Sequence, residues 1–200
     1  MIENSFLESG FSFTMAKLLP YIITVLIGLI LVFLLRNKLR IKNKFLLITV
    51  KLIVIAAPFG IYFATNPIYE GDFSNNCVEV ERKADYDELE DGKLYVLSIP
   101  GCPFCKMAMS KMIQLEERNP GLEIEYVVCS EDPSTMDFYT ENNEGKIPVQ
   151  LAQKPSELMD LSEGTFPTYV LVKKNEPLKT WSNQNFGVRA LDEVESLVVK

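Results

Sequence analysis

Two cysteines separated by two residues are the most reactive feature of the sequence. The apolar run 94–99 ends at Pro100-Gly101, and Cys102 and Cys105 follow at the start of a helix-favouring stretch. A cysteine in the first turn of a helix lies among backbone N–H groups that lack an intrahelical acceptor, at the positive end of the helix dipole. That environment favours the thiolate, which is the nucleophile in disulfide exchange. Cys105, three residues on, lies on the same helix face and can attack a mixed disulfide formed at Cys102.

The same Cys-x-x-Cys spacing also occurs in zinc sites. Two further cysteines, Cys77 and Cys129, would make a four-cysteine site arithmetically possible. They are widely spaced single cysteines, however, and the chain contains no histidine. The pattern therefore favours a redox-active disulfide, Cys102–Cys105, with no bound metal and no other cofactor.

A second motif lies downstream, where Pro167 opens a strand of β-branched and aromatic residues at 168–172. With both motifs, residues 85–200 resemble the thioredoxin superfamily, in which a cis-proline before a core strand faces the Cys-x-x-Cys pair. The resemblance implies an α/β, thioredoxin-like fold, with a central mixed sheet flanked by helices. It also implies that Pro167 is the cis-proline, that Cys102 attacks and that Cys105 resolves.

The resemblance further predicts the residues that contact a partner polypeptide. The partner chain would be positioned by the backbone at Thr165, Phe166 and Pro167. Pro103 and Phe104, between the two cysteines, complete the predicted contact surface, and this Pro-Phe pair is closer to the Pro-Tyr of glutaredoxins than to the Gly-Pro of thioredoxins.

Two departures from the superfamily pattern leave the direction of electron flow open. Thioredoxins usually carry a buried acid six residues before the first cysteine, where this chain has Val96. Many disulfide oxidases place a histidine between the cysteines, where this chain has Phe104. Oxidase, reductase and isomerase therefore all stay open as alternatives.

Two apolar stretches precede this domain. Residues 18–35 contain no charged side chain, and residues 45–65 contain only Lys51. At a rise of about 1.5 Å per residue, a helix of either length is close to the thickness of a hydrocarbon core, about 30 Å. We therefore predict a two-helix transmembrane hairpin, accompanied by an N-terminal tail at 1–17, a loop at 36–44 and a tether at 66–84.

Charge predicts the orientation of the hairpin. The loop 36–44 carries five Lys/Arg and no acid, and basic loops stay cytoplasmic. We therefore predict an integral protein of a bacterial inner membrane, with both termini and the thioredoxin-like domain outside the cytoplasm. Residues 66–200 carry thirteen Lys/Arg and twenty-five Asp/Glu, a net charge of −12, which argues against a nucleic-acid partner.

The remaining soluble sequence has the strand and helix order of the superfamily. Residues 144–164 give no clear pattern, and both a specificity-determining segment and a padding loop fit them. Elsewhere we expect strands at 78–81, 122–129, 168–173 and 178–181, a weak helix at 85–91, a helix at 130–142 and a closing helix at 188–199.

The two remaining cysteines allow two interpretations. Because lone thiols tend to pair in an oxidising compartment, we predict a structural disulfide between Cys77 and Cys129. The alternative is a buried apolar thiol at Cys129 and a free thiol at Cys77.

Two functions of different classes follow from these features. The first is a membrane-anchored, extracytoplasmic thiol–disulfide oxidoreductase that exchanges disulfides with protein partners and depends on a membrane electron-transfer partner. The second is a thioredoxin-like subunit or maturation scaffold of a membrane complex, in which the dithiol has no catalytic role.

Overall fold

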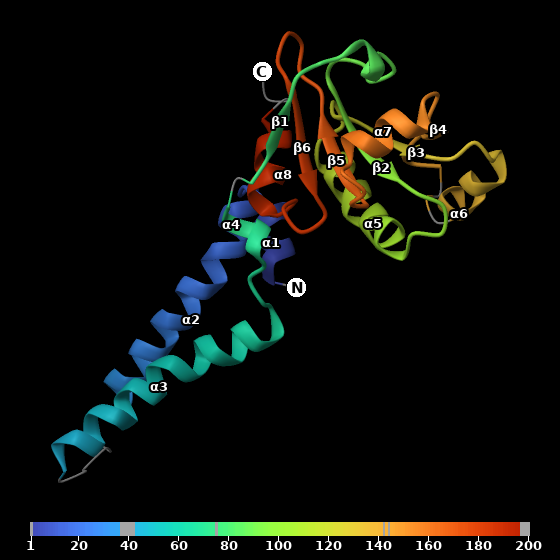
Figure 1. Cartoon of the computed structure of the whole chain (residues 1–200). Coiled ribbons are helices and arrows are strands. Elements are labelled where there is room, and N and C mark those ends of the chain that lie inside the picture. Colours follow the sequence, from blue (N-terminus) through green and yellow to red (C-terminus); the bar gives the residue numbers. More distant parts are fainter. Residues whose placement is uncertain (1, 37–42, 75, 142, 144, 197–200) are drawn as a thin grey trace. The chain divides into compact units, whose positions relative to one another are not determined.

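The structure is a computed structural model that describes residues 2–36, 43–74, 76–141, 143 and 145–196 (Figure 1). It divides into two compact units, residues 1–69 and residues 70–200. The two units are described separately.

The first unit is helical. It consists of the short helix α1 (Ile2–Glu8) and two long helices, α2 (Phe13–Leu35) and α3 (Lys44–Thr65). Ser12 accepts a hydrogen bond from the Met15 N–H at the start of α2, and Asn43 caps the start of α3 in the same way. Both long helices are long and apolar enough to cross a membrane.

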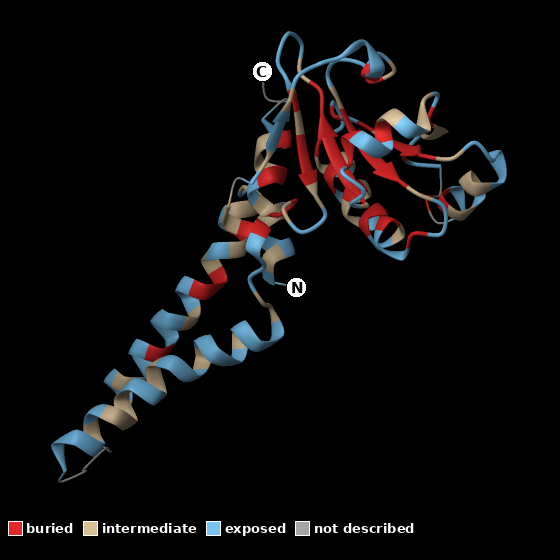
Figure 2. Cartoon of the chain, in the orientation of Figure 1, coloured by how far each residue is buried: buried red, intermediate tan, exposed pale blue. Residues whose placement is uncertain are grey.

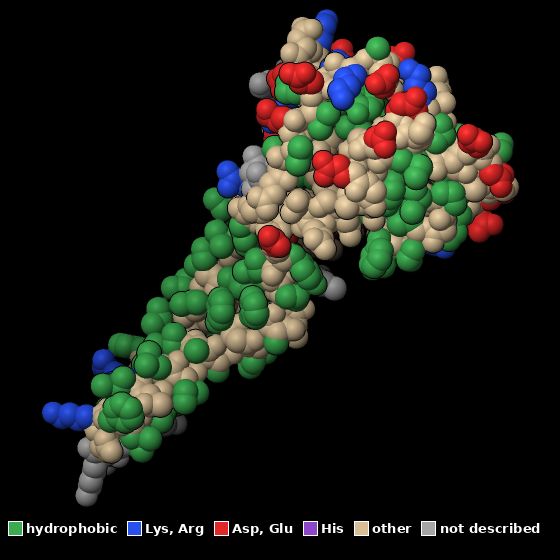
Figure 3. Space-filling view, viewed as in Figure 1, with side chains coloured by type: hydrophobic (Ala, Val, Ile, Leu, Met, Phe, Trp, Pro, Cys, Tyr) green, Lys and Arg blue, Asp and Glu red, His purple; other side chains and the backbone are tan. Residues whose placement is uncertain are grey.

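Most apolar side chains of α2 and α3 are exposed (Figures 2 and 3), as expected for helices that lipid surrounds. The two helices also pack against each other. Gly28 is buried at this contact, where an added Cβ would lie 2.4 Å from the carbonyl oxygen of Ile55. A small residue of this kind lets two apolar helices approach closely. That the helices cross a membrane, and in which orientation, is a prediction from length, composition and charge. Residues 37–42 of the basic loop lie outside the described residues.

The second unit is built on a mixed sheet of six strands, which confirms the predicted α/β fold class. The sheet order is β1 (Val78–Val80), β6 (Leu178–Ser182), β5 (Thr168–Leu171), β2 (Lys93–Ser98), β3 (Glu123–Val128) and β4 (Val149–Leu151). The β2–β3 and β3–β4 pairs are parallel and the other pairs are antiparallel.

Helices cover both faces of this sheet. One core cluster joins Tyr95 and Leu97 of β2 to helix α7 (Pro155–Leu161) and the 3-10 turn η1 (Ala84–Tyr86). Because side chains alternate along a strand, Leu94, Val96 and Ser98 face the opposite side. That side carries α5 (Pro103–Arg118) and α8 (Val188–Glu195), and the buried residues of β2 lie between the two layers (Figure 2).

Several elements differ from the sequence-based expectation. The weak helix at 85–91 is only the turn η1, and the helix at 130–142 is split into the 3-10 turn η2 (Pro133–Met136) and the short helix α6 (Asp137–Thr140). The unclear segment 144–164 contains β4 and α7. The closing helix ends at Glu195, and residues 197–200 lie outside the described residues.

Most of the segment predicted as a tether is part of the second unit. Helix α4 (Glu70–Phe73) packs against α8, and β1 pairs with β6 at one edge of the sheet. Two glycines make the α4 contact possible. A Cβ on Gly187 would lie 2.0 Å from the carbonyl oxygen of Gly71, and a Cβ on Gly71 would lie 2.4 Å from the carbonyl oxygen of Gln184. The backbones touch directly, so neither position accommodates a side chain.

We therefore expect Gly187→Ala to lower the free energy of unfolding of the second unit by about 3 kcal/mol, because the added methyl must push two backbones apart. Trp181 is the only tryptophan of the chain and is buried in this unit, so its fluorescence during urea denaturation of the full chain in detergent measures the effect. Asn183→Ala, an exposed change in the same connection, should alter stability by less than about 0.5 kcal/mol. Equal stability of the two variants would contradict the direct backbone contact.

Candidate functional site

The predicted cysteine pair lies at the start of α5. Cys102 is the N-cap residue and Pro103 occupies the first helical turn, where its missing N–H removes no helical hydrogen bond. The two cysteines form a disulfide, with their Cα atoms 5.3 Å apart. Cys102 Sγ accepts a hydrogen bond from the Cys105 N–H at 3.1 Å. The helix start therefore directs a donor and its positive dipole end at the Cys102 sulfur.

The two sulfurs differ in access to solvent. Cys102 is 7% exposed, whereas Cys105 is fully buried. Cys105 lies on the inner side of α5 with Met109 and Met112, which are also buried. An incoming thiolate or disulfide therefore reaches the sulfur of Cys102 first.

Pro167 lies at the same end of the sheet as the disulfide. Thr168 pairs with Leu97, so Pro167 follows in register at the end of β2 from which the chain leads to Cys102. The Phe166–Pro167 peptide bond is cis. Phe166 packs partly buried against the core cluster, and Pro167 is buried.

The loop before Pro167 is held by hydroxyl groups. The Thr168 hydroxyl donates to the Thr165 carbonyl oxygen at 2.6 Å, and the Thr165 hydroxyl donates to the Ser162 carbonyl oxygen at 2.9 Å. Thr165 itself is exposed. Phe104, between the cysteines, is also exposed at 59% of its surface. The structure thus brings the predicted partner-binding residues to one end of the sheet, together with the disulfide.

Tyr139 supports the turn that carries Cys102, a role that the sequence did not reveal. Its side chain is fully buried, and its hydroxyl donates to the Ile99 carbonyl oxygen at 2.6 Å. Burial raises the pKa of Tyr139 to about 12, although hydrogen bonds with the Ser98 side chain and the Cys102 backbone partly oppose the shift. The phenol therefore stays protonated at neutral pH and remains a donor. The only sequence-based prediction that included Tyr139 was the helix at 130–142.

In the part of the chain that the structure describes, no buried carboxylate takes the place of the acid that thioredoxins usually bury near the dithiol. Val96 is fully buried on the α5 side of β2. Among the described residues, Asp72 of α4 is the only buried carboxylic acid. Buried hydroxyls lie around the dithiol turn instead, and they include those of Ser98, Tyr126 and Tyr139. The described residues also contain no group of three or more metal-ligating side chains.

The predicted disulfide between Cys77 and Cys129 is not present, since both cysteines are free thiols. Cys77 directly precedes β1 and Cys129 directly follows β3, and four strand spacings separate these strands in the sheet. At about 4.8 Å per spacing the separation is about 19 Å, far beyond the Cα distance of about 7 Å that a disulfide can bridge. Cys129 is buried in the core cluster, and this burial raises its pKa to about 12.

No protein-family model and no curated protein match the sequence. The solved structures that resemble the chain are thioredoxin-like proteins and disulfide oxidoreductases. A secreted disulfide oxidoreductase of Mycobacterium tuberculosis, homologous to E. coli DsbE, has 18% identity and a TM-score of 0.40 over 55% of this chain and 82% of its own. A putative thioredoxin from Neisseria meningitidis has 20% identity and a TM-score of 0.43, with coverages of 62% and 88%. For StoA from Bacillus subtilis the identity is 20%, the TM-score 0.39 and the coverages 60% and 97%.

The support that Tyr139 gives to the dithiol turn is testable with Tyr139→Phe. We expect a loss of about 1 kcal/mol in the free energy of unfolding, because one hydrogen bond disappears while the Ile99 carbonyl keeps the bond from the Cys102 N–H. Tyr126→Phe is the matched control, since the Tyr126 hydroxyl makes a longer contact of 3.5 Å with the Cys105 carbonyl oxygen. Urea denaturation followed by Trp181 fluorescence compares the two. A larger loss for Tyr126→Phe would show that the Tyr139 contact does not support the turn.

Proposed function

We propose that the chain is a membrane-anchored, extracytoplasmic thiol–disulfide oxidoreductase that exchanges disulfides with protein partners through Cys102 and Cys105. The observation that carries the proposal is the disulfide at the start of α5, in which Cys102 keeps 7% of its surface exposed and Cys105 none, with Pro167 at the same end of the sheet. A helix start stabilises a thiolate, and a thiolate appears at Cys102 only when the disulfide opens. A purely structural disulfide stays closed and would gain nothing from this placement.

In the oxidising direction, a partner thiolate attacks Cys102 Sγ. The Cys102–Cys105 bond breaks, a mixed disulfide forms, and Cys105 leaves as a thiolate that takes up a proton. A second partner thiolate then attacks the partner sulfur of the mixed disulfide. This step releases the oxidised partner and the Cys102 thiolate, which the Cys105 N–H and the helix dipole stabilise.

The reducing direction is the reverse. The Cys102 thiolate attacks a partner disulfide, and one partner sulfur leaves as a thiolate. Cys105, after losing its proton, then attacks Cys102 Sγ, which closes the intramolecular disulfide and releases the second partner sulfur. Two electrons pass in either direction, and no prosthetic group is required.

The partner polypeptide lies against the loop before Pro167. Thr165 and Phe104 are exposed beside the disulfide, and Phe166 is partly exposed. These residues offer both backbone and apolar side-chain contacts to a chain that is covalently joined to Cys102.

The dithiol must be returned to its starting state by another redox protein, for which we propose a membrane electron-transfer partner. Four residues, 66–69, connect the end of α3 to the start of α4. Fully extended, they span about 14 Å. A chain anchored through α3 would share the membrane with such a partner.

Activity tests the roles of the two cysteines. The full chain in detergent should catalyse reduction of the insulin disulfides by dithiothreitol, and Cys102→Ser should reduce this activity to background. Cys105→Ser should instead accumulate mixed disulfides, because the resolving thiol is missing. Cys77→Ser, which removes a free thiol at the sheet edge, is the control and should retain activity. Full activity of Cys102→Ser would contradict the role assigned to Cys102, whereas a wild-type chain without activity would favour the scaffold alternative.

Orientation is tested by protease accessibility. With the basic loop 36–44 in the cytoplasm, a protease added to spheroplasts should remove a C-terminal tag and spare a tag placed in that loop. A C-terminal tag that stays protected until the membrane is lysed would place the dithiol in the cytoplasm. The partner would then be a soluble thiol pool in place of a membrane protein.

A further inference from the structure

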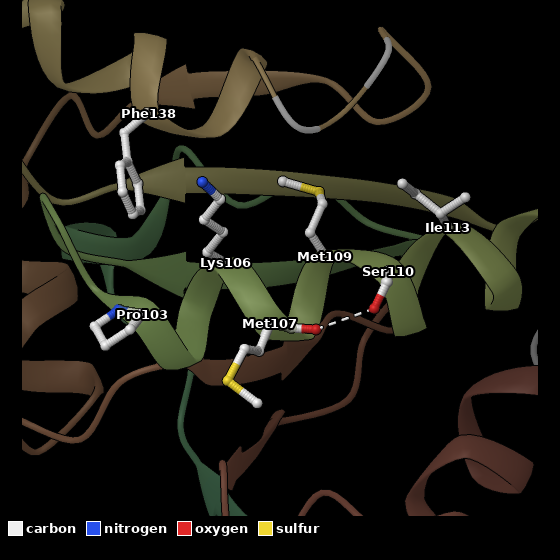
Figure 4. A pocket seen from close by; sticks show the side chains of 7 residues that line it. All are labelled: Pro103, Lys106, Met107, Met109, Ser110, Ile113 and Phe138. Carbon is white, nitrogen blue, oxygen red and sulfur yellow. Dashed lines mark hydrogen bonds between the residues drawn. The ribbon is translucent and has the colours of Figure 1, made fainter.

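A groove of about 500 Å³ lies along α5 on the side that faces α6 (Figure 4). Phe138 of α6 extends toward the first turns of α5 in this view. The lining residues are Pro103, Lys106, Met107, Met109, Ser110 and Ile113 from α5, and Phe138 from α6.

The lining of this α5–α6 groove is mainly apolar. Met107 is 71% exposed, whereas Met109 is buried. The Ser110 hydroxyl donates to the Met107 carbonyl oxygen at 3.2 Å, so its donor is used within the helix. Lys106 Nζ lies 4.9 Å from the centroid of the Phe138 ring and supplies the only charge of the lining. The groove therefore offers a partner apolar contact and little polar recognition.

The groove is continuous with the disulfide, because its first lining residue, Pro103, stands between the two cysteines. Ile113 is ten residues further along α5, or about 15 Å at the rise of an α-helix. An extended polypeptide advances about 3.3 Å per residue. A chain joined to Cys102 therefore reaches the far end of the groove within about five residues of its cysteine.

The groove lies on the other side of the disulfide from Pro167. Pro167 leads into β5, which neighbours β2 on one side, whereas α6 follows β3, which neighbours β2 on the other. A polypeptide that crosses the Cys102 sulfur can thus contact the Pro167 loop with one part and the groove with another.

We propose that the α5–α6 groove binds an extended apolar segment of a partner polypeptide, within about five residues of the cysteine that reacts with Cys102. This proposal rests on the proposed function and defines its substrate class as incompletely folded polypeptides. A folded protein buries most of its large apolar side chains, whereas an unfolded one exposes them next to its cysteines. Methionine side chains adapt to different shapes, so Met107 and Met109 suit partners that share apolar character but no sequence.

The test compares two extended peptides, each carrying one cysteine joined to glutathione through a disulfide. In one peptide leucine and phenylalanine stand three and four residues after the cysteine, and in the other both positions are serine. For the full chain in detergent, kept reduced by dithiothreitol and corrected for the rate without protein, we expect kcat/KM to be at least tenfold higher for the apolar peptide. That ratio corresponds to about 1.4 kcal/mol, which partial burial of one large side chain supplies.

Met107→Ser should lower the ratio of the two kcat/KM values to less than about threefold, because it removes the exposed apolar side chain of the groove. Met159→Ser is the matched control, since Met159 is an exposed methionine of α7 that does not line the groove, and should keep the tenfold ratio. An effect of a variant on the reactivity of the dithiol changes both kcat/KM values equally and so leaves their ratio unchanged. Trp181 fluorescence shows that each variant is folded.

Two results would overturn the proposal while leaving the proposed function intact. One is exchange with both peptides at equal rates in the wild-type chain. The other is an apolar preference that Met107→Ser leaves unchanged or that Met159→Ser removes equally. A wild-type chain that exchanges with neither peptide would instead overturn the proposed function, and the groove proposal with it.

Discussion

The junction between β2 and α5 is the constraint on which the rest of the second unit depends. Strand β2, buried from Leu94 to Ser98, leads into a turn of three residues, and Cys102 is the N-cap of the helix that follows. The Cys105 N–H then points at the Cys102 sulfur because the first N–H groups of a helix have no partner within it. The sheet, Tyr139 and α5 all fix this junction in place. The reactivity of one sulfur atom is thus set mainly by backbone geometry.

Local sequence signals were sufficient for the parts of the fold that depend on neighbouring residues. The apolar run 94–99 and the strand pair at 168–173 and 178–181 each depend on neighbouring residue types, and the structure has strands there. The Cys-x-x-Cys motif and Pro167 were also identified in this way. The register between β5 and β2 then brings these two motifs to one end of the sheet.

Features that depend on distant partners could not be predicted in the same way. A strand was expected at 78–81, but nothing in the sequence indicated that β1 would pair with β6, about one hundred residues later. Glu88 accepts hydrogen bonds from the backbone N–H groups of Gln153 and Lys154, which orders the start of α7 from a remote turn. Tyr139 likewise acquires its role only through contact with Ile99. None of these long-range pairings has a sequence pattern of its own.

The polar groups around the dithiol bear on the direction of exchange. Stabilisation of the Cys102 thiolate by the helix start favours the reduced form, as a low thiol pKa does in strong oxidants. Cys105 is fully buried, and among the described residues no buried carboxylate lies beside it to exchange a proton with its thiol. Tyr139 stays protonated and so accepts no proton. The groups around the dithiol thus do not by themselves set the direction of exchange. Whether the proposed exchange oxidises or reduces the partner depends on the reduction potential of the partner relative to that of the Cys102–Cys105 pair.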